Sequence, residues 1–259
     1  ELLDREQLDF IDIATRPASH LELVRLAAQR GIPAIVQKPL APTWKEAIEL
    51  VRIAREAGIR LMAHENWRWQ PWYREAKRRI DAGEIGPVFG YRLEMCQADG
   101  LGPTPYPNQP YFAEMPRLII FESLIHPIDT ARFLAGDIQS VYAQTSRRNP
   151  RIKGEDRALI LMTHGPGIDG FIEGHRYLNP EPPGPAMGGA MIQGEQGRLT
   201  IQATGEMFRD GKLIWRSPTE QGYKGDSVKA TQQHFIDCLR SGKPFEMDAA
   251  AYLGSVAAV

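Results

Sequence analysis

Residues that could do chemistry follow three strand-like runs in the first quarter of the chain. The runs cover residues 9–15, 32–39 and 59–66. Helical patterns separate them, so the runs are predicted to be successive strands of a parallel sheet. Ligands bind outside the carboxyl ends of such strands. We therefore expect Thr15, Lys38 and Asn66 to converge at one functional edge.

Lys38 stands between Gln37 and Pro39, directly after an almost wholly apolar strand. Its ammonium group is therefore expected to project from the sheet edge rather than from a solvated helix face. There it could donate a proton or a hydrogen bond to a substrate oxygen. The alternative is a lysine without a role, but the strand-end position favours function.

A second polar cluster lies on a predicted amphipathic helix over 118–134. Glu122, His126 and Asp129 are spaced i, i+4 and i+7, which places them on one stripe among apolar residues. One interpretation is that His126 is a general acid or base, tuned by Glu122 and facing Lys38 across an interdomain cleft. The other is a buried histidine with satisfied hydrogen bonds among surface carboxylates. The spacing leaves both open.

Local signals delimit the elements that must position these side chains. Helices are predicted after Pro17, with Gly31 as the stop, and after Thr43, with Gly58 as the stop. Thr43 and Glu46 fit the capping box, in which Glu46 would reach back to the Thr43 amide. An aromatic segment and a basic helix then lead out of the first part.

Beyond residue 88 the pattern becomes strand-like, with few intervening helices. The predicted strands are 88–96, 140–145, 158–163, 170–175, 189–193, 198–202 and 212–215. They indicate a mostly antiparallel open sheet. The fold class is therefore α/β, the second half of a Rossmann-type parallel sheet over 1–73, followed by an α+β substrate-binding and oligomerisation domain over 74–259. A first half-sheet of roughly 60–80 residues is expected to precede Glu1, at about 30 residues per βαβ unit.

Composition excludes several classes of protein. The 259 residues carry a formal net charge of −1 and are 42% hydrophobic, so we expect no nucleic-acid or membrane partner. Two cysteines imply no disulfide framework, and the cytoplasm is the expected compartment. The histidines and cysteines lack metal-ligand spacing, so no metal is predicted. The glycines of 165–170 have the spacing of a dinucleotide fingerprint, but they join two strands and are interpreted as a hairpin turn.

Several motifs together resemble those of the Gfo/Idh/MocA oxidoreductases. They are 12–20, Gln37-Lys38-Pro39-Leu40-Ala41, 84–88, His126-Pro127-Ile128-Asp129 and 133–136. The family has Glu-Lys-Pro where this chain has Gln37-Lys38-Pro39, and an acidic residue four before its catalytic histidine, as Glu122 precedes His126. Residues 65–74, 222–228 and 231–236 are similar to the D-apiose dehydrogenase branch of that family.

The resemblance implies hydride transfer between a nicotinamide cofactor, NAD or NADP with NAD favoured, and the carbon of a sugar or polyol hydroxyl, with D-apiose as one candidate substrate. By this analogy His126 takes the hydroxyl proton, Lys38 polarises the same oxygen and Glu122 tunes the pair. Asp129 and His175 would bind substrate. The residues expected to line the nicotinamide half of the cofactor site are Thr15, Arg16, Pro17, His20, Gln37, Asn66 and Arg68. A glycine-rich turn for the pyrophosphate is not found in this sequence.

Two other functions stay open. A glycosidase-type member would recycle its nicotinamide internally and show no net redox change. A non-catalytic subunit would use the scaffold for assembly alone, although Lys38 and His126 argue against it. Because a broad antiparallel sheet offers a large face that needs covering, we expect a homodimer or homotetramer formed through it.

Overall fold

The computed structural model describes residues 2–165, 167–218 and 225–259. Pro166 in the predicted hairpin turn and 222–224 in a segment similar to D-apiose dehydrogenases lie outside the described residues. Two compact units are present, unit 1 with Glu1–Glu65 and Lys229–Ala257, and unit 2 with Asn66–Val228 and Ala258–Val259. The ranges predicted from the sequence, 1–73 and 74–259, are each continuous, whereas both units join separate segments. The assignment of domains to those ranges stays a prediction.

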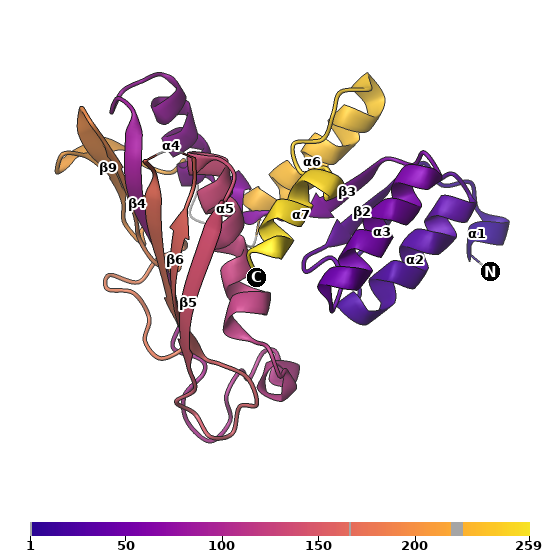
Figure 1. Ribbon diagram of the computed structural model, residues 1–259, viewed down its shortest axis with the longest axis horizontal. Helices are drawn as coiled ribbons and strands as arrows, with labels where there is room; N and C mark the ends of the chain where they lie inside the picture. The colour runs from indigo at the N-terminus through magenta and orange to yellow at the C-terminus, as the bar shows by residue number, and fades with distance from the viewer. Residues whose placement is uncertain (1, 166, 219–224) are drawn as a thin grey trace. The chain divides into compact units, whose positions relative to one another are not determined.

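Unit 1 is built on a parallel sheet, as predicted (Figure 1). Its strands are β1 (Ile11–Ile13), β2 (Ala34–Gln37) and β3 (Leu61–His64), paired in the order β1-β2-β3. The register aligns Ile13 with Val36, and Val36 with Ala63. The helices α2 (Pro17–Gln29) and α3 (Trp44–Glu56) connect the strands, after a short α1 (Leu2–Arg5). All four residues of β3 are buried, as parallel strands with covered faces require.

The ends of α2 and α3 follow the sequence signals. The Thr43 hydroxyl accepts a hydrogen bond from the Glu46 amide at 3.2 Å, which satisfies one unpaired donor of the first turn. Glu46 differs from the expected box, because its carboxylate accepts from the Thr43 hydroxyl at 2.6 Å. Gly31 and Gly58 follow the two helices at φ +65° and +68°, a conformation that glycine adopts without steric cost.

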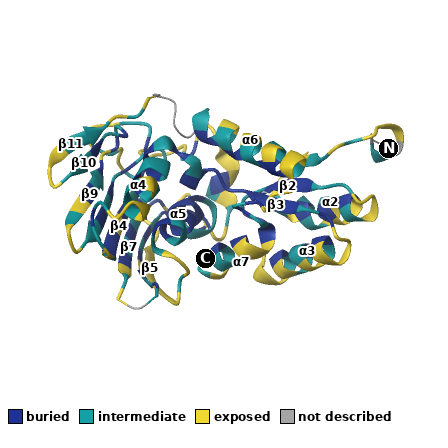
Figure 2. Cartoon of the chain, turned by 90° about the horizontal axis from the view of Figure 1, so that it is seen from above, coloured by how far each residue is buried: buried dark blue, intermediate teal, exposed yellow. Residues whose placement is uncertain are grey.

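Residues distant in sequence complete unit 1. The Ala63 amide of β3 donates to the Met247 carbonyl at 2.9 Å, and α7 (Ala249–Ala257) then packs on α3 and β3. Phe235 of α6 (Asp226–Ser241) contacts Phe10 edge to face, 5.2 Å between ring centroids. Figure 2 shows α6 on one side of this sheet, with α3 and α7 on the other. These contacts explain why the C-terminal helices belong to unit 1.

Unit 2 contains the predicted open sheet. Its strands are β4 (Val88–Cys96), β5 (Ser140–Ser146), β6 (Arg157–Thr163), β7 (Asp169–His175), β8 (Ala190–Gly194), β9 (Gly197–Ile201), β10 (Met207–Arg209) and β11 (Lys212–Trp215). Their order is β11-β10-β9-β8-β4-β7-β6-β5, and only the β4–β7 pairing among these described strands is parallel. The mostly antiparallel sheet is confirmed, and so is the β6–β7 hairpin. The sequence missed β10.

Helices cover one face of this sheet. They are η1 (Trp67–Trp69), α4 (Pro71–Asp81), the π-helix η3 (Ile119–Leu124) and α5 (Ile125–Ala135), and η2 (Pro110–Glu114) lies in the preceding loop. The helix predicted over 118–134 is therefore in two parts. The Glu155 carboxylate accepts from the amides of Leu118 and Ile120, at 3.1 and 3.3 Å, at the start of the π-helical part. A side chain 35 residues away in sequence thus takes part in the hydrogen bonding of that first turn.

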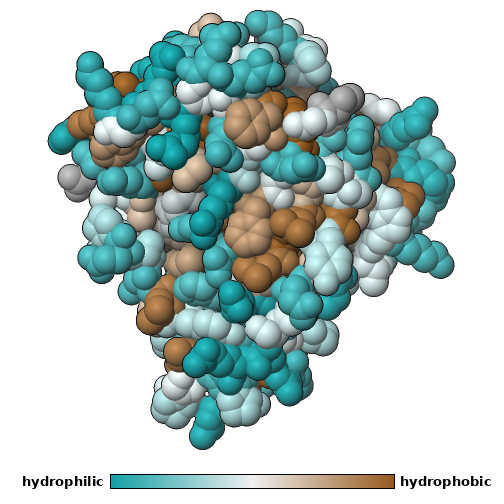
Figure 3. Space-filling view, turned by 60° about the vertical axis from the view of Figure 1, so that its left-hand side comes forward, coloured by the Kyte–Doolittle hydropathy of each residue, from teal (hydrophilic) through white to brown (hydrophobic). Residues whose placement is uncertain are grey.

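The opposite face of the sheet, here called the open face, exposes apolar side chains. Tyr142, Leu161 and Phe171 are aligned across β5, β6 and β7, and Tyr142 and Leu161 are 65% and 53% exposed. Figure 3 shows apolar side chains gathered among polar ones on this side. Every residue of the edge strand β5 is exposed. No helix of the described residues is both long and apolar enough to cross a membrane.

Candidate active site

The carboxyl ends of β1 and β2 carry the predicted polar residues of unit 1. Thr15 and Arg16 are exposed after β1, and Gln37 and Lys38 are half-buried at the end of β2. His20 of α2 is fully buried, and its ring nitrogens lie 2.9 Å from the Thr15 carbonyl and 3.1 Å from that of Leu40. His20 therefore fixes the two loops to each other, which makes it a positioning residue.

Gln37 is held by its neighbours. Its Oε1 accepts from the Lys38 amide at 3.0 Å, and its Nε2 lies 3.3 Å from Nδ1 of His64. The side chain thus links the ends of β2 and β3 and fixes the backbone at Lys38. This is a role that an amide can fill without a charge.

The donors at this edge suit a nicotinamide nucleotide. The hydroxyl of Thr15, the guanidinium of Arg16 and the ammonium of Lys38 can each donate to ribose hydroxyls, phosphate oxygens or a carboxamide. Pro17 opens α2 and keeps its first turn adjacent to them. The structure brings together the five cofactor residues predicted from this part of the chain, Thr15, Arg16, Pro17, His20 and Gln37.

In unit 2 the His126 imidazole is stacked on an indole ring. His126 is 4% exposed near the start of α5, and its ring lies 4.9 Å from that of Trp67, with 23° between the planes. Trp67 is itself hydrogen-bonded to the Tyr73 hydroxyl, while burial raises the pKa of Tyr73 to about 12. The backbone carbonyl of His126 accepts from Thr130 Oγ1 at 3.0 Å. The imidazole is therefore held in one plane by a buried aromatic pair.

Arg68 and Asp129 form a buried ion pair beside this stack. Arg68 Nε donates to Asp129 Oδ2 and Nη2 to Oδ1, both at 2.7 Å, and the Asp129 side chain is fully buried. Sequence reasoning assigned Arg68 to the cofactor and Asp129 to substrate, and it missed this pairing.

The other predicted residues of unit 2 lie on different elements. Glu122 is half-buried on the π-helix, so its four-residue separation from His126 is not a regular α-helical turn. Asn66 is buried and donates to Ser227 Oγ at 2.8 Å. Lys38 and Thr15 belong to unit 1, and His126 and Asn66 to unit 2. The expected convergence of these residues stays a prediction.

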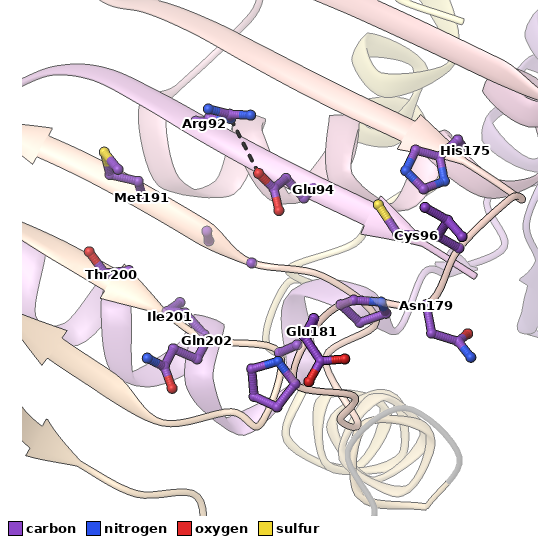
Figure 4. Close-up of a pocket in the computed structure, with 16 residues that line it drawn as sticks. Arg92, Glu94, Cys96, His175, Asn179, Glu181, Met191, Thr200, Ile201 and Gln202 are labelled. Carbon is purple, nitrogen blue, oxygen red and sulfur yellow. Dashed lines mark ion pairs between the residues drawn. The ribbon is translucent and has the colours of Figure 1, made fainter. Parts of the chain in front are cut away.

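His175 lies on the open face of the sheet. Adjacent strand residues point to opposite faces, and a Cβ on Gly174 would approach Leu124 of the π-helix within 2.3 Å, so His175 points away from that helix. It stacks on Tyr177 and lines a hollow of ≈ 420 Å³ with Glu94, Cys96 and other residues (Figure 4). The structure therefore does not bring His175 to the face that carries His126.

The cysteines are free thiols, and burial raises the pKa of Cys96 to about 12, which keeps it protonated. Among the described residues, no three or more His, Cys, Asp or Glu side chains are grouped so as to hold a metal ion.

A parallel sheet with polar residues at the carboxyl ends of its strands is the arrangement by which Rossmann-type folds bind dinucleotides. Residues 1–65 match the model "Oxidoreductase family, NAD-binding Rossmann fold", and residues 73–200 match "GFO/IDH/MocA C-terminal domain". The chain belongs to the GFO/IDH/MocA oxidoreductase family, which confirms the resemblance found in the sequence.

Named relatives include sugar and polyol dehydrogenases. D-apiose dehydrogenase of Paraburkholderia graminis is 38% identical over 93% of this chain and 66% of its own length. That of Rhizobium rhizogenes is 37% identical over 90% and 70%. The scyllo-inositol 2-dehydrogenase (NAD(+)) of Bacillus subtilis is 29% identical over 94% and 71%. The chain thus spans about two thirds of the length of these relatives.

Solved structures share the fold. An oxidoreductase from Agrobacterium radiobacter, in complex with NAD+, L-tartaric acid and magnesium, is 34% identical with a TM-score of 0.88, over 99% of this chain and 77% of that one. A levoglucosan dehydrogenase in complex with NADH and L-sorbose has a TM-score of 0.84 at 20% identity, over 99% and 79%. Both agree with the NAD-binding fold expected for the first part of this chain.

Proposed function

We propose that this chain acts in an NAD-dependent dehydrogenase that oxidises a secondary or primary hydroxyl of a sugar or polyol. The supporting observation is that two D-apiose dehydrogenases match 90% or more of the chain, and the chain has Lys38 and His126 at the positions described above. D-apiose is the first substrate to test.

In this proposal His126 Nδ1 or Nε2 accepts the hydroxyl proton, and the Lys38 ammonium donates a hydrogen bond to the same oxygen. The hydroxyl becomes a carbonyl as its O–H bond gives up a proton and its C–H bond gives up a hydride. A bound nicotinamide ring supplies the hydride acceptor. Glu122 would tune the histidine electrostatically.

The residues of unit 1 and those of unit 2 have different proposed roles. Thr15, Arg16, Pro17 and Gln37 would hold the nicotinamide half of the cofactor, with His20 fixing their loops. Asp129 is bound to Arg68 through both carboxylate oxygens, so we propose that the pair acts by positioning α5 rather than by touching ligands. We propose no substrate-binding role for His175, because it lies on the open face.

The first experiment measures NAD and NADP reduction at 340 nm by the full-length protein with D-apiose, scyllo-inositol and levoglucosan. We expect substrate-dependent reduction of NAD with at least one of these compounds. Product formation without a net absorbance change would indicate the internally recycled reaction. Absence of any dinucleotide binding by nicotinamide fluorescence would leave only the structural-subunit alternative.

The second experiment replaces the two proposed catalytic residues. Lys38→Ala and His126→Asn should each lower kcat by about 100-fold or more, the usual size of an acid/base contribution, with NADH binding retained. Lys45→Ala is the matched control, because Lys45 is exposed on α3. Turnover within a few-fold of the parent in both variants would contradict the assignment.

We further propose that two copies of the chain associate through the open face, as a homodimer or within a homotetramer. The apolar row of exposed Tyr142 and Leu161 and half-buried Phe171 supports this, since a second copy would remove it from water. A cytoplasmic location stays a prediction from the sequence.

A further inference from the structure

Arg176 follows β7 and is buried, with 6% of the residue exposed. It points to the helix-covered face, the same as Gly174 and opposite to His175. Its guanidinium binds two partners from different segments. Nε donates to Asp99 Oδ1 at 2.7 Å and Nη2 to Oδ2, while Nη1 donates to Ser123 Oγ at 3.1 Å. A buried arginine is thus satisfied by a carboxylate and a hydroxyl.

The first partner segment is the loop 97–118. Two parts of this loop are joined by a hydrogen bond, in which the Tyr106 amide donates to the Asp99 carbonyl at 2.7 Å. The guanidinium lies 5.1 Å from the Tyr106 ring and 5.6 Å from that of Phe112, at cation–π distance. Gly100 donates to the Arg176 carbonyl, and a Cβ there would come within 2.6 Å of Arg176 Cβ. The loop is therefore wrapped tightly on Arg176.

The second partner segment is the π-helix η3. Ser123 is 4% exposed and stands three residues before His126, while Glu122 precedes it. The next residue, Leu124, packs where Gly174 has no side chain. The start of the helix is held by the Glu155 carboxylate. Of the three side-chain hydrogen bonds named here, the one from Arg176 to Ser123 is nearest to His126 in sequence.

We propose that Arg176 is a positioning residue, which joins the 97–118 loop to the π-helix and thereby holds Glu122 and His126 in their reactive orientation. This inference rests on the proposed function, in which His126 takes the substrate proton. The ion pair with Asp99 fixes the Arg176 guanidinium, and the hydrogen bond from that guanidinium to Ser123 Oγ then restrains the π-helix. π-helical turns are rare and occur frequently at functional sites, so a hydrogen bond from outside the turn bears on the geometry of such a site.

Ser123→Ala tests this link while leaving the Arg176–Asp99 pair intact. We expect kcat to fall about tenfold, which is about 1.4 kcal/mol, with KM and NADH affinity changed less than about twofold. Amide hydrogen exchange over 119–126 should quicken, a readout that does not depend on activity. Ser123→Thr retains a hydroxyl and should recover most of the turnover. Ser255→Ala, another fully buried serine but in α7, is the matched control.

The outcomes separate this inference from the proposed function. Faster exchange with lower kcat in Ser123→Ala, both reversed in Ser123→Thr, supports it. Unchanged exchange, or faster exchange with parental kcat, overturns it, because Arg176 would then serve stability alone. If the parent protein oxidises no sugar or polyol, the proposed function fails, and the inference about catalysis fails with it. The exchange data would still decide whether Arg176 holds the helix.

Discussion

His164 shows how a buried titratable residue makes stability depend on pH. Its Nδ1 lies 2.7 Å from the Gly136 carbonyl, so this nitrogen carries the proton, and Nε2 accepts from the Tyr91 hydroxyl at 2.7 Å. Burial lowers the pKa of His164, while the Gly136 carbonyl opposes the shift. Arg132 also lowers this pKa, and Asp137 raises it. The net effect favours the neutral ring in the folded protein.

We expect acid to destabilise the protein partly through this ring. The pKa of His164 is lower in the folded state than the value of about 6.5 in the unfolded chain, so the unfolded chain binds more protons below about pH 6.5. The part of the free energy of unfolding that depends on a neutral His164 is therefore fully present above about pH 6.5 and is lost as the pH falls. Denaturant unfolding at pH 8 and 5.5 should show a larger loss for the parent than for His164→Gln. An equal loss would contradict the prediction.

For single residues, the sequence indicated which polar side chains are unusual better than it indicated their hydrogen-bond partners. It singled out His126 and Asp129 correctly as unusual polar residues on an apolar helix, and both are buried. It could not pair Asp129 with Arg68, because 61 residues separate them and no local pattern encodes such a contact. Likewise, His20 carried no signal that both its nitrogens would meet backbone carbonyls. The residues assigned from resemblance await the kinetic test.

Among the elements, β7 is distinguished by two glycines that admit large neighbours. Gly170 is paired with Tyr91 across the parallel β4–β7 ladder, and a Cβ at Gly170 would lie 1.8 Å from Cζ of that ring. The aromatic ring thus occupies the space that a side chain would need. Tyr91 in turn holds His164, so this contact also supports the β6–β7 hairpin.

Gly170→Ala should therefore destabilise unit 2. The Tyr91 ring must move to admit the methyl group, which we expect to lower the free energy of unfolding by about 1–3 kcal/mol, the usual cost of overpacking. Gly165→Ala is the control from the same hairpin, because a Cβ there meets nothing within 4 Å, and it should change stability by less than about 0.5 kcal/mol. Equal denaturation midpoints for the two variants would refute this reading.

Elements with a strong repeating pattern were predictable, and irregular ones were not. The predicted range of β4 matches Val88–Cys96 because its alternation is sustained over nine residues. β10 has only three residues, too few for a period-2 pattern. The π-helix was predicted as α-helix because its apolar residues suit both conformations, and the Glu155 carboxylate that accepts from its first amides lies outside the segment.

For the whole molecule, the open face gives the proposal of self-association a direct test. Leu161→Glu places a carboxylate in the apolar row, and burying it without a partner costs several kcal/mol. We expect the dissociation constant of the oligomer to rise by about 100-fold or more, as measured by light scattering during size-exclusion chromatography. Leu26→Glu, at an exposed leucine of α2, should leave the mass unchanged. A monomeric parent, or a variant that keeps the parental mass, would rule out this interface.

The division of the chain was only partly readable from its sequence. The sequence predicted a change of architecture after residue 73, and unit 2 begins at Asn66 but also includes Ala258–Val259. No local sequence pattern indicated that α6 and α7 pack in unit 1 with the parallel sheet. Such an arrangement depends on packing between segments more than 160 residues apart, for which a single sequence gives no periodic signal.

The packing of α6 and α7 in unit 1 has a consequence for how the protein is made. A ribosome delivers β1, β2 and β3 before the Asn66–Val228 segment of unit 2, and only afterwards the segment whose Met247 carbonyl binds Ala63. During synthesis of the intervening 163 residues, Asn66–Val228, the β3 amide that will bind Met247 stays without that partner. An unpaired strand edge invites association with other chains. The nascent chain is therefore vulnerable to association in the interval before α6 and α7 emerge, while unit 2 can already complete most of its core.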